Sequence, residues 1–113
     1  MIWDIAYYVS PDGDTPVADF LLSLSDKECG KCLQYIMIRS ENGPRLPTQY
    51  AKYIDNGIWE LRPEYGGKEI RLFYVAFVDN LIVLLHGCKK PNTQKAFRRE
   101  FDIAAKRRED LSK

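Results

Sequence analysis

The sequence predicts an α+β fold in which a helical hairpin packs on a mainly antiparallel sheet of roughly four to five strands, with a further helix at the C-terminus. Two amphipathic helical patterns follow each other in the first half of the chain. Residues 58–86 then consist of apolar runs separated by short turns, as in antiparallel strands. With 113 residues, of which 45% are hydrophobic and 29% charged, the chain is expected to form one domain over residues 1–113.

The N-terminal segment predicts a strand followed by a short helix. Residues 2–9 are rich in β-branched and aromatic side chains and end at the turn sequence Ser-Pro-Asp-Gly of residues 10–13. Asp14-Thr15-Pro16 then places a capping side chain before a proline, which is tolerated at the first position of a helix. The apolar residues that follow repeat with helical spacing: Val17, Phe20, Leu21 and Leu24.

A second helix is expected to begin after the capping pair Ser25-Asp26 and to end at the Asn-Gly-Pro sequence of residues 42–44. Its apolar stripe includes Cys29 and Cys32. Because the connection between the two helices is short, they should form a hairpin on one face of the sheet. Beyond them, residues 50–54 predict a short strand.

Residues 58–62 predict a strand that is entered through a hairpin turn. The preceding Asn56-Gly57 favours the positive φ angles of such a turn. Alternation in the strand places Glu60 and Arg62 on one face, opposite Trp59 and Leu61.

Residues 69–78 predict the central strand of the sheet, because both of its faces are largely apolar. Alternation places Arg71 on the same side as Phe73. A two-residue turn leads into a last strand at residues 81–86, and a helix follows from residue 92 or 93. This helix combines an apolar stripe with many basic residues.

The charge is unevenly distributed along a chain of net charge +1. Residues 1–57 hold five basic and eight acidic side chains, whereas residues 86–113 hold nine and four. A basic end on a nearly neutral protein suggests a local anionic partner, such as RNA, DNA or an acidic peptide. The sequence shows neither a secretory signal nor a membrane span, and three cysteines fit poorly with a disulfide framework. A cytoplasmic protein without a membrane partner is expected.

Several short motifs occur in order along the chain: Trp59-Glu60-Leu61-Arg62-Pro63, Arg71-Leu72-Phe73-Tyr74, Leu84-Leu85-His86-Gly87 with Lys89-Lys90, Thr93-Gln94-Lys95 and Arg107-Arg108-Glu109. Together they resemble the RelE/HigB toxins of type II toxin–antitoxin systems, and in particular the phage-derived, killer-protein branch of the RelE/ParE superfamily. The resemblance extends more weakly over the N-terminal half. The chain departs from the pattern at Cys88, where an aromatic residue is common, at the inserted Pro91-Asn92, and at Ala96-Phe97, which replace a frequent Thr-Pro.

The resemblance implies a RelE-like fold and a metal-independent endoribonuclease that cleaves mRNA, often on the ribosome, and thereby inhibits translation. It implies no cofactor. The implied partners are mRNA, the ribosome and a cognate antitoxin, expected to be of the helix-turn-helix type. Two alternatives remain open: a ParE-like toxin that poisons DNA gyrase without cutting RNA, and an RNA-binding protein without catalytic activity.

Cleavage of RNA without a metal requires an activated 2′-hydroxyl, compensation for charge on the phosphoryl oxygens and a proton for the leaving oxygen. Arg71 and Arg62 are the candidates for phosphate stabilisation, although each could instead pair with Glu60. His86, the only histidine, is a candidate acid or base or else a structural residue. Lys89 and Lys90 are candidates for positioning the RNA backbone, or else form a solvated loop.

The start of the last helix offers further candidates for contacts with the RNA backbone: Lys95, Arg98 and Arg99. A solvated helix face is the alternative. A zinc site formed by Cys29, Cys32, His86 and Cys88 can be written down from the sequence. The cysteines at positions 29 and 32 also fit the apolar helix stripe unaided, so no metal site is expected.

Overall fold

The computed structural model describes residues 2–44, 46–77 and 79–112. Within these residues, six strands form a sheet in which five follow the order β1-β6-β5-β3-β2 and β4 pairs with β5. Strand β1 runs parallel to β6, and the other pairings are antiparallel. The elements are β1 (Asp4–Tyr7), α1 (Pro16–Ser23), α2 (Asp26–Asn42), β2 (Ala51–Asp55), β3 (Ile58–Leu61), β4 (Glu64–Tyr65), β5 (Lys68–Phe77), β6 (Leu81–Lys89) and α3 (Gln94–Leu111). The predicted α+β class is confirmed.

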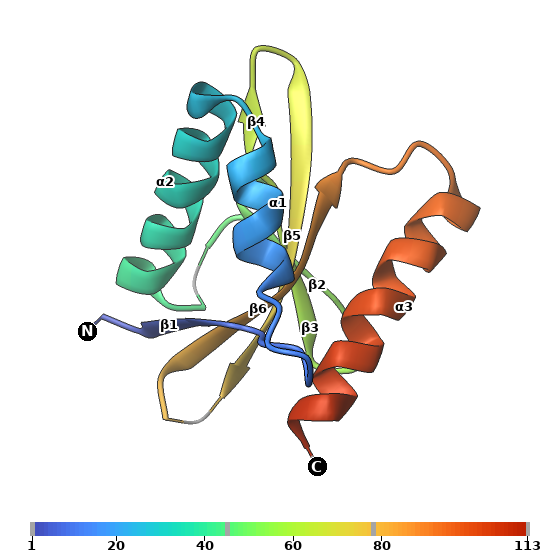
Figure 1. Cartoon of the computed structure of the whole chain (residues 1–113). Helices are drawn as coiled ribbons and strands as arrows, with labels where there is room; N and C mark the ends of the chain where they lie inside the picture. The colour runs from blue at the N-terminus through green and yellow to red at the C-terminus, as the bar shows by residue number, and fades with distance from the viewer. Residues whose placement is uncertain (1, 45, 78, 113) are drawn as a thin grey trace.

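Helices α1 and α2 cover one face of the sheet, and α3 covers the other (Figure 1). We call these the hairpin face and the α3 face. The expected start of α2 is formed as a capping box, in which Ser25 Oγ accepts from the Glu28 amide and the Glu28 carboxylate accepts from the Ser25 amide. No helix in the described part of the chain is long and apolar enough to cross a membrane.

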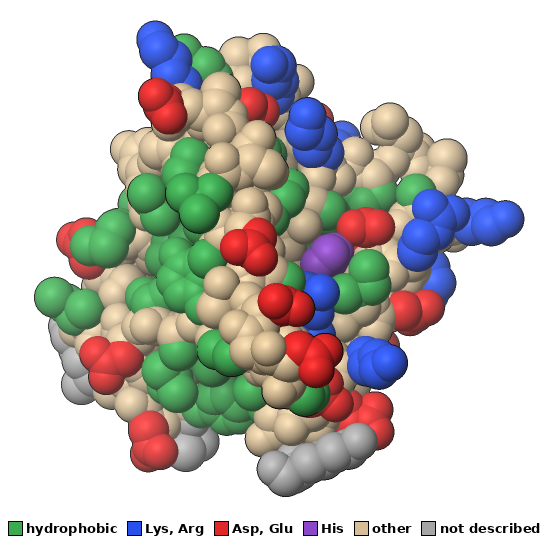
Figure 2. All heavy atoms as spheres, viewed as in Figure 1, with side chains coloured by type: hydrophobic (Ala, Val, Ile, Leu, Met, Phe, Trp, Pro, Cys, Tyr) green, Lys and Arg blue, Asp and Glu red, His purple; other side chains and the backbone are tan. Residues whose placement is uncertain are grey.

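The core of the hairpin face is built from the alternate residues of the strands that point toward α1 and α2. Leu72 and Tyr74 of β5 pack there with Leu84 of β6, Val17 of α1 and Ile36 of α2. Several large apolar side chains of the hairpin remain exposed, and green side chains gather over this part of the surface in Figure 2: Leu22, Leu33 and Met37.

The core of the α3 face uses the intervening residues of the same strands. Phe73 and Val75 of β5 pack with Leu85 of β6 and with Phe101 and Ala104 of α3. The apolar stripe predicted for the last helix is therefore the part of α3 that contacts the sheet.

A β-bulge in β6 sets the direction of His86. Phe73 pairs with His86 and Tyr74 pairs with Leu84, so Leu85 is an extra residue between them. Simple alternation from Leu84 would direct His86 toward the hairpin face. After the bulge, the His86 ring stacks on Phe73 of the α3 face, with ring centroids 6.2 Å apart.

Three features of the sheet differ from the expected boundaries. The turn at Gly66-Gly67, where both φ angles are positive, carries the short additional strand β4 on its entry side. Strand β6 continues to Lys89 rather than ending at residue 86, because the bulge lets residues 87–89 keep pairing with β5. The strand expected at residues 2–9 spans only Asp4–Tyr7.

Candidate functional site

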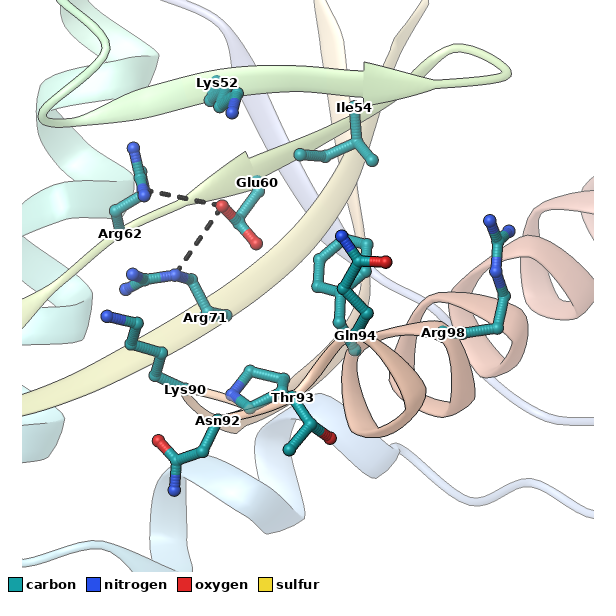
Figure 3. A pocket seen from close by; sticks show the side chains of 12 residues that line it. Lys52, Ile54, Glu60, Arg62, Arg71, Lys90, Asn92, Thr93, Gln94 and Arg98 are labelled. Atoms are coloured by element: carbon teal, nitrogen blue, oxygen red, sulfur yellow. Dashed lines mark ion pairs between the residues drawn. The ribbon is translucent and has the colours of Figure 1, made fainter.

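A cleft of about 610 Å³ opens on the α3 face, between strands β2, β3 and β5 and the loop that leads into α3 (Figure 3). It is lined by Lys52, Ile54, Glu60, Arg62, Arg71, Lys90, Pro91, Asn92, Thr93, Gln94, Phe97 and Arg98. Basic side chains outnumber the single acidic one, so the cleft suits an anionic ligand.

The pairing of β3 with β5 positions the residues on one wall of this cleft, and the N-terminal cap of α3 positions those on the other. Glu60 pairs with Phe73 across β3 and β5, which places Glu60 beside Arg71 on the same face. On the other wall, Thr93 Oγ1 accepts from the Ala96 amide at 3.0 Å and so fixes the start of α3. Both walls therefore rest on regular backbone, which holds their side chains in place.

Glu60 is the carboxylate at the floor of the cleft, with 4% of its surface exposed. Its Oε1 lies 3.5 Å from Arg62 Nε and 3.6 Å from Arg71 Nε. The other oxygen points away from both arginines (Figure 3). Burial raises the pKa of the Glu60 carboxyl, and the charges of Arg71 and Arg62 offset part of that rise. A carboxylate with a raised pKa is a better proton acceptor than an exposed one.

Arg71 is buried among protein acceptors. Its Nη1 donates to the Ile70 carbonyl at 3.0 Å, and its Nη2 donates to Glu69 Oε1 at 3.3 Å. Glu69 Oε2 also lies 3.2 Å from Lys90 Nζ, and the hydrogen bonds from Lys90 and Arg71 lower the pKa of the Glu69 carboxyl. Arg71 therefore forms ion pairs with both Glu60 and Glu69, and it also lines the cleft.

Arg62 and Lys90 are the more accessible cations of the cleft. The Arg62 side chain is 32% exposed, and its Nη1 donates to the Thr48 carbonyl at 3.3 Å. The Lys90 side chain is 47% exposed. Lys52 and Arg98 also line the cleft. Phosphate contacts are therefore open to four side chains around the single carboxylate.

His86 lies outside the cleft, in a polar network between β6 and α3. Its Nε2 is 2.8 Å from Glu100 Oε1, and its Nδ1 is 3.1 Å from Arg107 Nη1, which also donates to the Leu85 carbonyl at 2.9 Å. Burial lowers the pKa of His86, and the Glu100 carboxylate opposes this shift. The histidine, drawn in purple, reaches the surface in Figure 2. It does not line the cleft.

The remaining sequence candidates also lie outside the cleft. Lys89 lines a separate cavity of about 250 Å³ together with Lys68 and Lys90. Lys95 and Arg99 are exposed on α3 and do not line the cleft, in contrast to Arg98. The structure thus brings Arg62, Arg71, Lys90 and Arg98 together and leaves His86, Lys89, Lys95 and Arg99 around them.

Most of the chain matches the model of a known protein family. Residues 19–109 match the family described as phage derived protein Gp49-like (DUF891). The chain belongs to the Gp49-like family. This family is toxin-like and occurs in toxin–antitoxin systems, which agrees with the phage-derived toxin resemblance of the motifs. The matched range contains every residue that lines the cleft. No curated protein sequence matches the chain.

Several residues that line the cleft of this Gp49-like protein were not predicted from the sequence as site residues. Lys52 and Gln94 are ordinary surface residue types, and only the fold brings them to the cleft. Glu60 was expected only as an ion-pair partner. The signal that could have singled it out is its position between Trp59 and Leu61 in a half-buried strand, where a carboxylate is costly unless it is paired.

The zinc ligands suggested by the sequence do not converge in the Gp49-like fold. Cys29 and Cys32 pack on the hairpin face, whereas His86 and Cys88 lie on the α3 face. Ligand atoms of His86, Cys88 and Glu100 do lie within 4.8 Å of one another. However, Arg107 donates to His86 Nδ1, so Nε2 of the neutral ring carries the proton and faces Glu100. Burial also raises the pKa of the Cys88 thiol to about 12. This geometry fits a hydrogen-bonded network better than a metal centre.

Proposed function

We propose that this Gp49-like protein is the toxin of a type II toxin–antitoxin system and acts as a metal-independent endoribonuclease on mRNA, with the ribosome as the place of cleavage. One observation carries the proposal. A buried carboxylate, Glu60, sits between Arg62 and Arg71 at the floor of a cleft whose other charged groups are cations. The cognate antitoxin, expected to carry a helix-turn-helix domain, would block this cleft.

In the proposed reaction Glu60 accepts the proton of the RNA 2′-hydroxyl. The 2′-oxygen forms a bond to the adjacent phosphorus, and the bond from phosphorus to the 5′-oxygen breaks, which leaves a 2′,3′-cyclic phosphate and a 5′-hydroxyl. The raised pKa of Glu60 suits this role, and a well-placed general base contributes a factor of about 10²–10⁴ to the rate. Lys90 is the proposed donor of the proton that the 5′-oxygen needs.

The negative charge that develops on the phosphoryl oxygens would be stabilised by Arg62, the accessible arginine of the cleft, and by Arg71 once the phosphate displaces Glu69. Each such donor can contribute roughly 3–4 kcal/mol in a site from which water is excluded. Lys52 and Arg98 would hold the backbone on either side, and Lys89, Lys95 and Arg99 would extend its path. His86 would act through the position of α3, because it does not line the cleft.

The decisive experiment compares wild type with Glu60→Gln on ribosome-bound mRNA, and on free mRNA in the presence of EDTA. The wild type should cut and leave cyclic phosphate ends. Glu60→Gln should be slower by about 10²–10⁴-fold. Glu41→Gln, which changes an exposed glutamate on α2, is the matched control and should cut normally.

The pH profile gives an independent test of the base. Because burial raises the pKa of Glu60, kcat/KM should rise with pH through a midpoint above that of an ordinary glutamate. This limb should vanish in Glu60→Gln. Arrest of growth by a protein that leaves RNA intact would contradict the nuclease and favour a toxin that binds a protein target such as gyrase.

Arg62→Ala is a cleaner probe of phosphate contact than Arg71→Ala. Arg62 is partly exposed, so its removal should lower the cleavage rate while the fold is kept. Removal of Arg71 would leave Glu60 and Glu69 without a shared partner, and breaking a buried pair costs about 3–5 kcal/mol. Unfolding curves of both variants separate the two effects.

A further inference from the structure

A second cavity, of about 290 Å³, adjoins the cleft and shares Arg62 and Arg71 with it. The two cavities thus lie on either side of the same pair of arginines. The wall of the smaller cavity includes two tyrosines, Tyr35 of α2 and Tyr50 at the entry to β2. A phosphate held by Arg62 in the cleft would have this aromatic wall as its neighbour.

The two tyrosines are held in place by the fold. Their ring centroids are 5.3 Å apart, with the planes inclined by 50°. The backbone of Tyr50 is fixed at both ends, because its amide donates to the Pro47 carbonyl and its carbonyl accepts from the Arg62 amide, each at 2.9 Å. Tyr50 and Arg62 are therefore directly linked, and both rings remain partly exposed.

We propose that this cavity is a nucleobase subsite, which receives the base of a nucleotide beside the scissile phosphate and stacks it on Tyr35 and Tyr50. This inference rests on the proposed RNA substrate, and it adds two tyrosines that would position the RNA in the cleft. Unpaired RNA bases stack on aromatic rings, and an arginine guanidinium can cover the opposite face of a base. Arg62 supplies such a guanidinium in the same cavity.

A bound base also needs hydrogen-bond partners for its edge, and the cavity provides polar groups for this. Gln49 and Glu64 line it beside the tyrosines, and both can form hydrogen bonds with a base edge. The lining thus combines two aromatic rings, for stacking, with five polar or charged side chains: Gln49, Arg62, Glu64, Glu69 and Arg71. The cations that could bind the phosphates line the cleft beyond Arg62. The smaller cavity would thus bind the base of a nucleotide, and the cleft would bind its phosphate.

The test uses a single-stranded oligoribonucleotide that is 2′-O-methylated to prevent cleavage and carries 2-aminopurine at one position in turn. Stacking on a tyrosine quenches the fluorescence of this base. Wild type should quench it at one position, and Tyr50→Leu should abolish that quenching and weaken binding about tenfold. Tyr50→Phe keeps the ring and should behave as wild type.

The matched control is Tyr53→Leu, which removes a more exposed tyrosine of β2 that does not line the cavity. It should leave quenching unchanged. If Tyr50→Leu and Tyr35→Leu both quench as wild type does, the subsite is refuted.

Cleavage assays keep this inference separate from the nuclease. Position-specific quenching that depends on Tyr50, in a protein that never cuts, would refute the nuclease and support the subsite. In a protein that cuts, the mapped ends should show a base preference next to the cut that Tyr50→Leu abolishes. Cutting with the same preference in Tyr50→Leu would refute the subsite alone.

Discussion

The two faces of the sheet each bury an arginine, but they surround it differently. On the hairpin face Arg39 lies between aromatic rings, 4.7 Å from the Trp3 centroid and 5.4 Å from the Tyr74 centroid, and its Nε donates to the Tyr74 hydroxyl at 3.1 Å. On the α3 face Arg71 lies between Glu60 and Glu69. The first arginine is packed as part of a core, whereas the second organises charges at a cleft.

The surroundings of the two arginines indicate different roles: Arg39 contributes to the stability of the core, and Arg71 to the proposed functional site. Among the described residues, no carboxylate forms an ion pair with Arg39, so its burial depends on stacking and on one hydrogen bond. The buried carboxylate of Glu60 beside Arg71 carries a desolvation cost that an apolar pair would avoid. Buried charge at a cleft is therefore the reason why we propose the α3 face as the functional one.

Among the substitutions outside the cleft, Gly87→Ala is expected to have the largest effect on stability. Gly87 follows His86 in β6 but faces α1, and a Cβ there would lie 2.5 Å from Phe20 Cδ2 and 3.0 Å from Leu72 Cδ2. Gly87→Ala should therefore lower the free energy of unfolding by about 2–3 kcal/mol. Urea unfolding monitored by circular dichroism measures the change.

Gly30→Ala is the matched control on the same face. Gly30 is exposed on α2, where a Cβ would meet no atom within 4 Å. Alanine should stabilise the helix by up to about 1 kcal/mol. Equal effects of the two substitutions would mean that α1 does not pack closely on β6.

The same stretch of β6 shows how far the sequence could predict this protein. The helices, the order of the turns and the shared face of Glu60 and Arg62 follow from local patterns, and the structure agrees with them. The ion pair of Arg71 with Glu60 was foreseen only as the alternative to a contact with phosphate. The bulge at Leu85 does not follow from local patterns, because an apolar strand carries no signal for an extra residue. The direction of His86 could therefore not be predicted from alternation alone.

The contributions of Lys52 and Gln94 to the cleft were unpredictable for a different reason. Their positions depend on how β2 pairs at the edge of the sheet and how α3 is placed against the opposite wall. Such long-range packing cannot be predicted from any short segment of the sequence. Paired carboxylate and arginine residues in strands, by contrast, could be found from alternation alone.

Each face of the sheet is covered by a helix whose N-terminus is capped by a side chain. Ser25 caps α2, and Thr93 caps α3 at the cleft. Ser25→Ala and Thr93→Ala should each cost about 1 kcal/mol of stability. Only Thr93→Ala should also slow RNA cleavage, because the cap holds the wall that contains Gln94 and Phe97. Equal loss of cleavage rate in both variants would show that the two faces are not functionally separate.

The smallest expected effect concerns pH and the network around His86. Glu100, Arg107 and Cys88 are the titratable groups that face this ring, and burial lowers its pKa below the unfolded value. A depressed histidine pKa contributes stability above the unfolded pKa, and this stability is lost as pH falls through the folded pKa. Acidification from about pH 7.5 to about pH 5.5 should therefore destabilise the wild type more than His86→Gln.

The loss should be confined to the α3 face, since the only histidine of the chain lies there. Amide hydrogen exchange at the lower pH should accelerate in α3 before it does in α2. Glu100→Gln is the informative companion, because it removes the carboxylate that raises the pKa of His86 and should leave the acid sensitivity in place or increase it. Identical pH dependence of wild type and His86→Gln would mean that the ring takes up its proton as easily in the folded protein as in the unfolded chain.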